Sequence, residues 1–132
     1  MDPRLDIITT LNTLFWATDH HDWDTLLAHV FSDQVTLDYG EPELLSPQEI
    51  IGRWRPVFEG LDVHQHLVSN HLITLRDDAA TVTASFIATH QHAHGTWTLG
   101  GDYRFSLHNT PSGWKVTAME MRPVWEEGVG IG

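Results

Sequence analysis

Apolar residues in the first 60 positions recur with a helical period. Asp2 and Pro3 are typical of an N-cap and a first helical residue, and they predict a helix that ends between Thr18 and His21. Its apolar stripe consists of Leu5, Ile8, Leu11, Leu14 and Phe15. Asp22 or a neighbour then caps a second helix, whose inward residues are Trp23, Leu26, Leu27 and Val30. The chain is therefore expected to begin with two helices.

A short strand and a third helix follow. Apolar and polar residues alternate over 35–39, which indicates a half-buried strand, and the Gly-Glu-Pro segment at 40–42 breaks it. Ser46 and Glu49 have the spacing of a capping box, with a proline between them at the first helical position. The buried face of this helix consists of Ile50, Ile51, Trp54, Val57 and Phe58. Gly60 is expected to end it.

After Gly60 the pattern changes to a period of two. Four long strands are predicted, over 63–76, 80–92, 97–108 and 114–122, and residues 126–132 are expected to form a loose loop. Three helices followed by a four-stranded meander indicate an α+β fold, with helices packed on a strongly curved, mostly antiparallel sheet. Such a sheet can close into a cone-shaped α+β barrel whose mouth holds a small-molecule pocket.

Composition narrows the class of protein. The 132 residues suit a single domain over 1–132. Seven Lys and Arg against 18 Asp and Glu give a net charge of -11, which argues against binding to nucleic acid or an anionic membrane. The absence of cysteine excludes disulfides, thiolate metal sites and a cysteine nucleophile. No apolar run is long enough to span a bilayer and no signal peptide is evident, so a cytoplasmic location is the default expectation.

Histidines supply the candidate chemistry. His64, His66 and His71 lie in the first long strand, and histidine can take or give a proton near neutral pH. The cluster therefore indicates a proton-transfer site or a metal site. On a regular strand His64 shares a face with His66, whereas His71 points the other way. His20 and His21 are expected at the surface, in the turn between the first two helices and within reach of the pocket mouth.

Five loose motifs follow one another along the chain. They are Asp19-x-x-Asp22-Trp23-x-x-Leu26, Phe31-x-Asp33-x-Val35-x-x-Asp38-Tyr39, His66-x-x-x-Asn70-x-x-Ile73, Ala88-x-His90, and Gly113-Trp114-Lys115-Val116 before Trp125. In this order and spacing they resemble the SnoaL-like branch of the nuclear transport factor 2-like (NTF2-like) superfamily, and among its enzymes the scytalone dehydratases. This fold hosts dehydratases, isomerases, cyclases, epoxide hydrolases and non-catalytic binders.

The resemblance implies a set of site residues. His66 matches the family's general base, Asp19 matches the carboxylate that orients it, and His90 matches the second active-site histidine. Tyr39 matches one of two tyrosines that hold a water against the substrate carbonyl, and the second of these falls on Thr18.

Other pocket positions depart from the family or are less specific. Tyr103 stands where the family has a pocket asparagine, so it can supply the phenol that is missing at Thr18. The family's longer C-terminal lid is also missing. Further substrate-binding candidates are Asn70, Trp54, Phe86, Met119 and Trp125, although strand geometry suits Asn70 and a core position suits most of the others.

These residues make chemical sense without the family. Loss of water β to a carbonyl needs removal of a C–H proton and protonation of the departing hydroxide, and one histidine can do both in turn. A buried carboxylate such as Asp19 would fix its tautomer and stabilise the imidazolium. Tyr39 or Tyr103 would donate to the enolate oxygen. No cofactor is required.

A second histidine motif offers an alternative. His90, His92 and His94 share one face of a continuous strand, and with His66 they could bind zinc or iron. Gly95 favours a turn that splays His92 and His94 into solvent, so we expect no metal there.

The sequence therefore predicts a cofactor-independent lyase, a dehydratase acting on a small cyclic or polyketide-derived hydroxy-carbonyl compound. An isomerase or cyclase of a polyketide- or steroid-like enone with the same base is the first alternative, and a non-catalytic small-molecule-binding domain is the second. The resemblance also implies a homodimer or higher homo-oligomer through the open sheet face.

Overall fold

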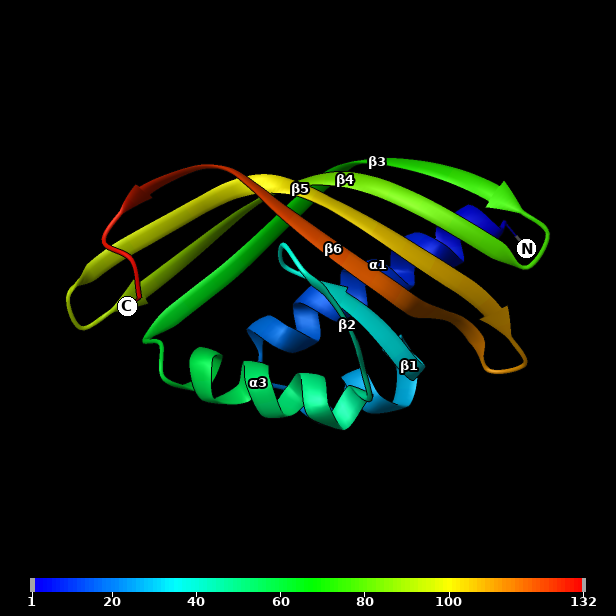
Figure 1. The fold of residues 1–132 in the computed structure, drawn as a ribbon, viewed down its shortest axis with the longest axis horizontal. Helices are drawn as coiled ribbons and strands as arrows, with labels where there is room; N and C mark the ends of the chain where they lie inside the picture. The colour runs from blue at the N-terminus through cyan, green and yellow to red at the C-terminus, as the bar shows by residue number, and fades with distance from the viewer. Residues whose placement is uncertain (1, 132) are drawn as a thin grey trace.

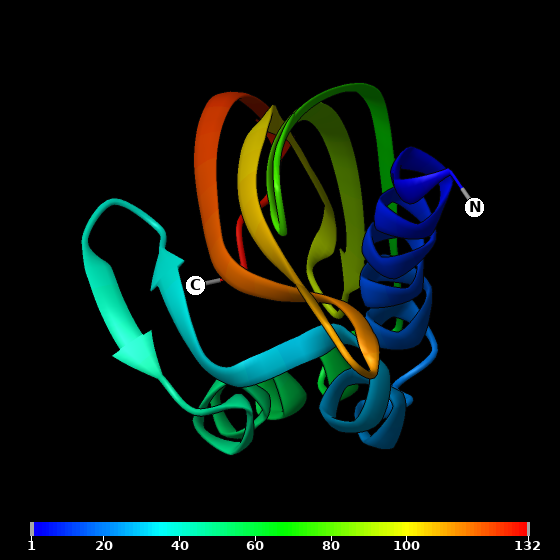
Figure 2. The same ribbon diagram turned by 90° about the vertical axis from the view of Figure 1, so that its right-hand side faces the viewer.

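The computed structural model describes residues 2–131, which form one strongly curved sheet with helices on its concave side (Figures 1 and 2). The helical elements are α1 (Pro3–Asp19), α2 (Trp23–Thr25), the π-helix η1 (Leu26–Val30) and α3 (Pro47–Glu59). The strands are β1 (Phe31–Asp38), β2 (Pro42–Leu45), β3 (Val63–Arg76), β4 (Ala79–His92), β5 (Gly95–Thr110) and β6 (Gly113–Gly128). None of the helices in this described range is both long and apolar enough to cross a membrane.

The six strands are ordered β2-β1-β6-β5-β4-β3, so the last four form the predicted meander. β1 pairs with β6 in parallel, and the other neighbours are antiparallel. The sheet is strongly curved but not closed, because β2 and β3 remain as its two edges. The predicted α+β class with helices on a curved sheet is confirmed, and the barrel is an open one.

Local sequence signals set the starts of α1 and α3. The Asp2 side chain accepts a hydrogen bond from the Arg4 backbone N–H at 3.0 Å and caps α1. Ser46 and Glu49 form the expected capping box at the start of α3. α1 ends at Asp19, within the predicted limits, and this end lies beside β3.

A single apolar core joins the helices to the sheet. Fully buried residues of α1 and of the inner sheet face meet there, among them Ile7, Leu11, Leu14, Val82 and Phe105. Leu5 of the predicted stripe is instead 65% exposed, so the buried face of α1 is centred on Ile7. Burial of such aliphatic side chains stabilises a fold by about 1.5–3 kcal/mol each.

The strands differ from the prediction in three main ways. β1 begins at Phe31, four residues before the predicted start at Val35. β2, which pairs antiparallel with β1, was not expected, because Pro42–Leu45 is short and does not alternate. β6 runs to Gly128, so the segment from Glu126 is partly strand rather than loop. Beyond β6, the Val129 backbone N–H still donates to the Thr96 carbonyl of β5 at 2.9 Å.

A β-bulge in β3 changes the orientation of His71. The register shifts between Ser69 and Leu72, and Asn70 has a φ of 60°. One extra residue reverses the alternation beyond this point. His71 therefore lies on the same, inner face as His64 and His66 and is half-buried, and the prediction that it faces the other way is wrong.

Candidate active site

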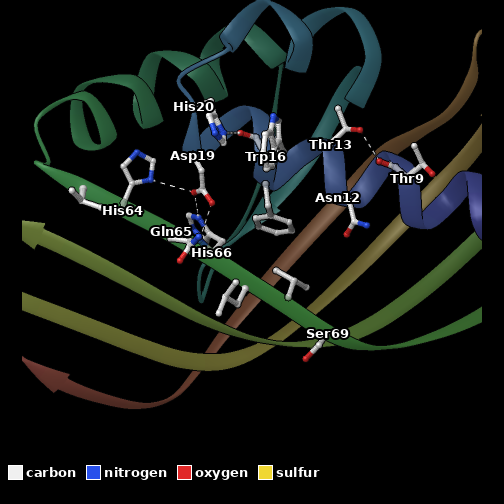
Figure 3. Close-up of a pocket in the computed structure, with 14 residues that line it drawn as sticks. Thr9, Asn12, Thr13, Trp16, Asp19, His20, His64, Gln65, His66 and Ser69 are labelled. Carbon is white, nitrogen blue, oxygen red and sulfur yellow. Dashed lines mark hydrogen bonds and ion pairs between the residues drawn. The ribbon is translucent and has the colours of Figure 1, made fainter.

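The last residue of α1 holds the histidine in the middle of β3 at two points. Asp19 Oδ1 lies 2.7 Å from His66 Nδ1, and Asp19 Oδ2 accepts the His66 backbone N–H at 2.9 Å. These side chains are 12% and 8% exposed. Two contacts to one carboxylate fix the ring and the strand against the end of the helix (Figure 3).

This geometry fixes the proton on His66 and the charge on Asp19. A carboxylate can only accept, so neutral His66 carries its proton on Nδ1 and leaves Nε2 free as a base. Burial raises the pKa of Asp19, but the neighbouring His64 and His66 outweigh it and lower the pKa from 3.8 to about 2. Asp19 is therefore ionised at neutral pH and can stabilise an imidazolium at His66.

His66 also lines a small cavity inside the curved sheet. The cavity has a volume of about 20 Å³, and its walls are Phe15, Thr18, Tyr39, Trp54, Phe58, His66, Tyr103 and Met119. That space suits about one water molecule. Four of the predicted site residues other than His66 are therefore brought together with it: Tyr39, Trp54, Tyr103 and Met119.

Two phenols and an indole supply hydrogen-bond donors to this cavity. Burial raises the pKa of Tyr103 well above its usual value, so its hydroxyl stays protonated. Tyr39 exposes half of its surface, yet its hydroxyl end is enclosed, and burial raises its pKa too, against a smaller lowering by Trp54. Trp54 Nε1 is buried near Tyr39 but makes no well-formed hydrogen bond to a described residue. Such a donor is costly to leave unpaired.

Tyr39 stands between the cavity and the surface. It also lines a depression of about 220 Å³ formed with residues 38–40 and 120–123. Thr18, at the position of the missing second tyrosine, donates its hydroxyl to the Leu14 carbonyl at 2.7 Å. The hydroxyl of Thr18 is thus used within α1.

His90 is buried near His66 but is held differently. Its Nδ1 lies 3.1 Å from the Trp97 carbonyl oxygen, and its ring stacks on Trp97. Because a carbonyl only accepts, Nδ1 carries the proton and Nε2 is an acceptor. The His66 and His90 ring centroids are 6.3 Å apart. Burial lowers the pKa of His90, which favours the neutral ring.

Three of the predicted substrate-binding residues lie outside the cavity lining. Asn70 is exposed at the bulge of β3 and borders a shallow depression with residues of β4, β5 and β6. Trp125 pairs with Gly100, and its ring occupies the space that a side chain there would fill. Phe86 is buried behind Tyr103, with ring centroids 4.3 Å apart.

The second histidine motif diverges, but only His94 is exposed as predicted, whereas His92 is half-buried. β4 ends at His92, and His94 is exposed in the following turn. His92 Nε2 bonds to the Val129 carbonyl at 2.7 Å. Among the described residues, the one group of His, Asp and Glu side chains whose ligand atoms are close enough to hold a metal is instead Asp19, His64 and His66.

Sequence reasoning gave no role to His64 and His21. His64 is buried with its Nδ1 at 3.3 Å from Asp19 Oδ1, and its Nε2 bonds to His21 Nε2 at 2.8 Å. The spacing of two residues between His64 and His66 was the available signal, since it puts both on one face. The contact with His21 was not visible in the sequence, because it joins residues 43 positions apart.

A wide groove lies outside the cavity, between α1 and β3 (Figure 3). Its volume is about 1100 Å³, and Asp19, His64 and His66 border it together with Trp16 and residues 63–69. His66 thus separates the groove from the inner cavity, whereas Asp19 faces the groove.

Solved structures of other proteins share this fold. A protein from Novosphingobium aromaticivorans named as a candidate scytalone dehydratase is 16% identical, with a TM-score of 0.87 over 98% of this chain and 89% of that one. A candidate aromatic ring hydroxylase from the same organism is 27% identical, with a TM-score of 0.85 over 96% and 92%. A type 2 hexachlorocyclohexane dehydrochlorinase is 10% identical, with a TM-score of 0.84 over 97% and 89%.

The family assignment comes from the sequence itself. No curated protein matches the chain closely enough to indicate homology. The sequence profile of the SnoaL-like domain matches residues 1–120, which include every residue of the cavity lining. Other solved structures of this shape are called NTF2-like. The chain belongs to the SnoaL-like domain family, and its fold is that of NTF2-like structures.

Proposed function

We propose that this protein is a cofactor-independent dehydratase whose general base is His66. The observation that carries the proposal is the double contact of Asp19 with His66, at Nδ1 and at the backbone N–H, beside a cavity lined by two tyrosines. An imidazole with a bare Nε2 and an ionised partner is suited to removing a proton from carbon. The substrate class is a small cyclic or polyketide-derived β-hydroxy-carbonyl compound.

In the proposed reaction, the proton that His66 removes from the substrate is returned to the departing hydroxide. His66 Nε2 removes the proton from the carbon α to the carbonyl, and the electron pair forms an enolate. Tyr39 or Tyr103 donates to the enolate oxygen, directly or through one water. The C–O bond at the β carbon then breaks, and the hydroxide leaves as water with the proton from His66. A C=C bond remains, and no other reactant is consumed.

His90 orients the leaving hydroxyl in this scheme. Its Nδ1 proton is directed to the Trp97 carbonyl, so neutral His90 can accept a hydrogen bond at Nε2 but cannot donate one there. It would therefore hold the substrate O–H, while His66 delivers the proton.

Substrate binding requires the cavity to widen. A ring compound does not fit in about 20 Å³, whereas small-molecule pockets usually have volumes of about 300–1,000 Å³. Tyr39 borders both the cavity and the outer depression, and it is the side chain whose rotation would join them.

Two other functions stay as alternatives. The same base could move a proton within an enone or close a ring, because either reaction also begins with C–H deprotonation. A binding domain would use the cavity without turnover.

The deciding experiment uses a panel of β-hydroxy ketones built on one or two six-membered rings. Loss of water is followed by the absorbance of the new enone, with the wild type, His66→Ala and His71→Ala. His71 is a matched control, because it lies on the same face of β3 and outside the cavity lining. Equal turnover by wild type and His66→Ala would contradict the proposal. Binding of a panel compound without turnover would favour the binding domain.

We also propose a homodimer through the outer face of the sheet. Leu67, Leu72 and Ile87 are large apolar side chains exposed on β3 and β4. Light scattering after size exclusion should give about twice the chain mass of 15.0 kDa, and a mass equal to one chain would contradict it.

A further inference from the structure

Asp19 has a second histidine neighbour, to which the dehydratase scheme gives no role. His64 Nδ1 lies 3.3 Å from Asp19 Oδ1, and the His64 side chain is only 3% exposed. His64 Nδ1 nevertheless makes no hydrogen bond to any described residue. The other ring nitrogen, Nε2, is bonded to His21 Nε2 at 2.8 Å.

A buried imidazole nitrogen this close to a carboxylate oxygen needs a proton or a metal ion beside it. When His64 donates its Nε2 proton to His21, Nδ1 presents a lone pair, and the lone pair and the carboxylate repel each other. A proton on Nδ1 or a metal ion removes the repulsion. A proton on Nδ1 would make only a long contact with Asp19 Oδ1, at 3.3 Å, which does not meet the usual hydrogen-bond geometry.

We propose that Asp19 Oδ1, His64 Nδ1 and His66 Nδ1 bind a divalent transition-metal ion, of which zinc suits this ligand set best. One ligand atom from each of the three residues lies within 4.8 Å of the others, and both Nδ1 atoms approach Asp19 Oδ1. In a tetrahedral site with bonds of about 2.0–2.1 Å, neighbouring ligand atoms are about 3.3 Å apart. His64 and Asp19 already have this separation.

Binding requires one small adjustment at His66. Its Nδ1 is 2.7 Å from Asp19 Oδ1, a hydrogen-bond distance, and this pair would open by about 0.6 Å when a metal replaces the proton. The proton must leave for the metal to bind, so the affinity should fall as the pH is lowered.

Two of the ligands are oriented by a further contact, as in protein metal sites. The His66 backbone N–H holds Asp19 Oδ2 at 2.9 Å, which leaves Oδ1 for the ion. His21 holds His64 Nε2, and when His64 donates its Nε2 proton in this contact its Nδ1 is bare. His21 does so from a left-handed backbone conformation, with a φ of 57° and its ring stacked near Trp23. Non-glycine residues rarely adopt this conformation, and it costs free energy.

The groove beside the three ligand residues would let an ion reach the site and would leave room for a further ligand. All three ligand residues border the groove of about 1100 Å³ between α1 and β3, where a water or a ligand atom could complete the site (Figure 3). The net charge of -11 favours cations generally. Because the ion would take Oδ1 and Nδ1 from the Asp19–His66 pair, the metal-bound protein and the acid–base form exclude each other. Metal binding itself does not depend on the dehydratase proposal.

The test is a Co²⁺ titration of chelator-treated protein, followed by the visible absorption of cobalt in a tetrahedral site, with Zn²⁺ binding measured by calorimetry. The wild type should bind one equivalent, and His64→Ala should bind at least about tenfold more weakly. His64→Gln is the second variant, because its amide can keep the contact with His21 while nothing replaces Nδ1. The control is the His92→Ala/His94→Ala double variant, which removes two histidines outside the group and should bind like the wild type.

Three results would overturn the proposal. One is the absence of a saturable equivalent in the wild type, which would mean that a proton alone stands between His64 and Asp19. Another is equal affinity of the wild type and a folded His64→Gln protein, with folding checked by circular dichroism. The third is loss of the bound equivalent in the double variant, which would place the ion at the end of β4.

Discussion

The histidines in the middle of β3 and those at the end of β4 are similarly spaced in the sequence, but their partners differ. His64 and His66 face the carboxylate of Asp19. His90 and His92 instead bond to the backbone carbonyls of Trp97 and Val129. Both kinds of partner fix a tautomer, but a carboxylate also stabilises a positive charge on the ring. Asp19, at the end of α1, therefore gives the β3 histidines a contact with a charged group that His90 and His92 lack.

The largest expected effect is on catalysis by the β3 group. His66→Ala should lower kcat/KM for a panel substrate by about 10²–10⁴, the usual contribution of a general acid–base. His71→Ala, on the same face of β3, should change it little. A comparable loss in both variants would mean that the inner face of β3 matters for packing and not for proton transfer, and circular dichroism of both proteins serves as the folding control.

Removing the partner instead of the base should be nearly as damaging. Asp19→Asn keeps the shape of the side chain but removes the charge that stabilises the imidazolium. The expected result is a loss mainly in kcat with a smaller change in KM, since Asp19 does not line the cavity. A loss confined to KM would contradict the positioning role of Asp19.

Acid should weaken the same contact in the folding equilibrium. The pKa of Asp19 is lowered to about 2, so its contribution to stability is present above its ordinary value near 3.8 and is lost as the pH falls from about 4 towards 2. A lowering of this size corresponds to about 2 kcal/mol. Asp19→Asn should thus unfold at lower urea than the wild type at pH 7, and the difference should shrink below about pH 4. A difference that is constant over this range would be inconsistent with an ionised Asp19.

The histidine of β4 nearest to the site and the one in the following turn should have graded, smaller effects. His90→Ala should lower turnover by about tenfold, the equivalent of one hydrogen bond in the transition state. His94→Ala, which is exposed, should change the free energy of unfolding by no more than about 0.5 kcal/mol. Steady-state kinetics measures turnover and urea denaturation measures stability for both variants. A larger loss of turnover in His94→Ala than in His90→Ala would contradict this order.

Most of the fold could be predicted from the sequence, because its signals are local. The capping box at Ser46, the helix start at Asp2 and the period of two after Gly60 each set an element that the structure contains. β2 has no comparable signal in its four residues. The bulge at Asn70 could not be predicted either, since exposed Leu67 and Leu72 on the outer face hide the reversal of the alternation.

The candidate site was predictable only in part. The pairing of Asp19 with His66 followed from the resemblance to the SnoaL-like family and not from the pattern, because 47 residues separate the two. The contact between His21 and His64 depends on the shape of the turn between α1 and α2. Neither the hydrophobic period nor a motif encodes that shape.

The most direct test of the central claim is the position of the proton on His66. A long-range ¹H–¹⁵N spectrum of metal-free protein, recorded at a pH where the histidines are neutral, distinguishes the two tautomers. We predict that His66 carries its proton on Nδ1, towards Asp19, with Nε2 bare. Asp19→Ala should lose this preference. A proton on His66 Nε2 in the wild type would contradict the account, because the ring would then have no free base to present to a substrate.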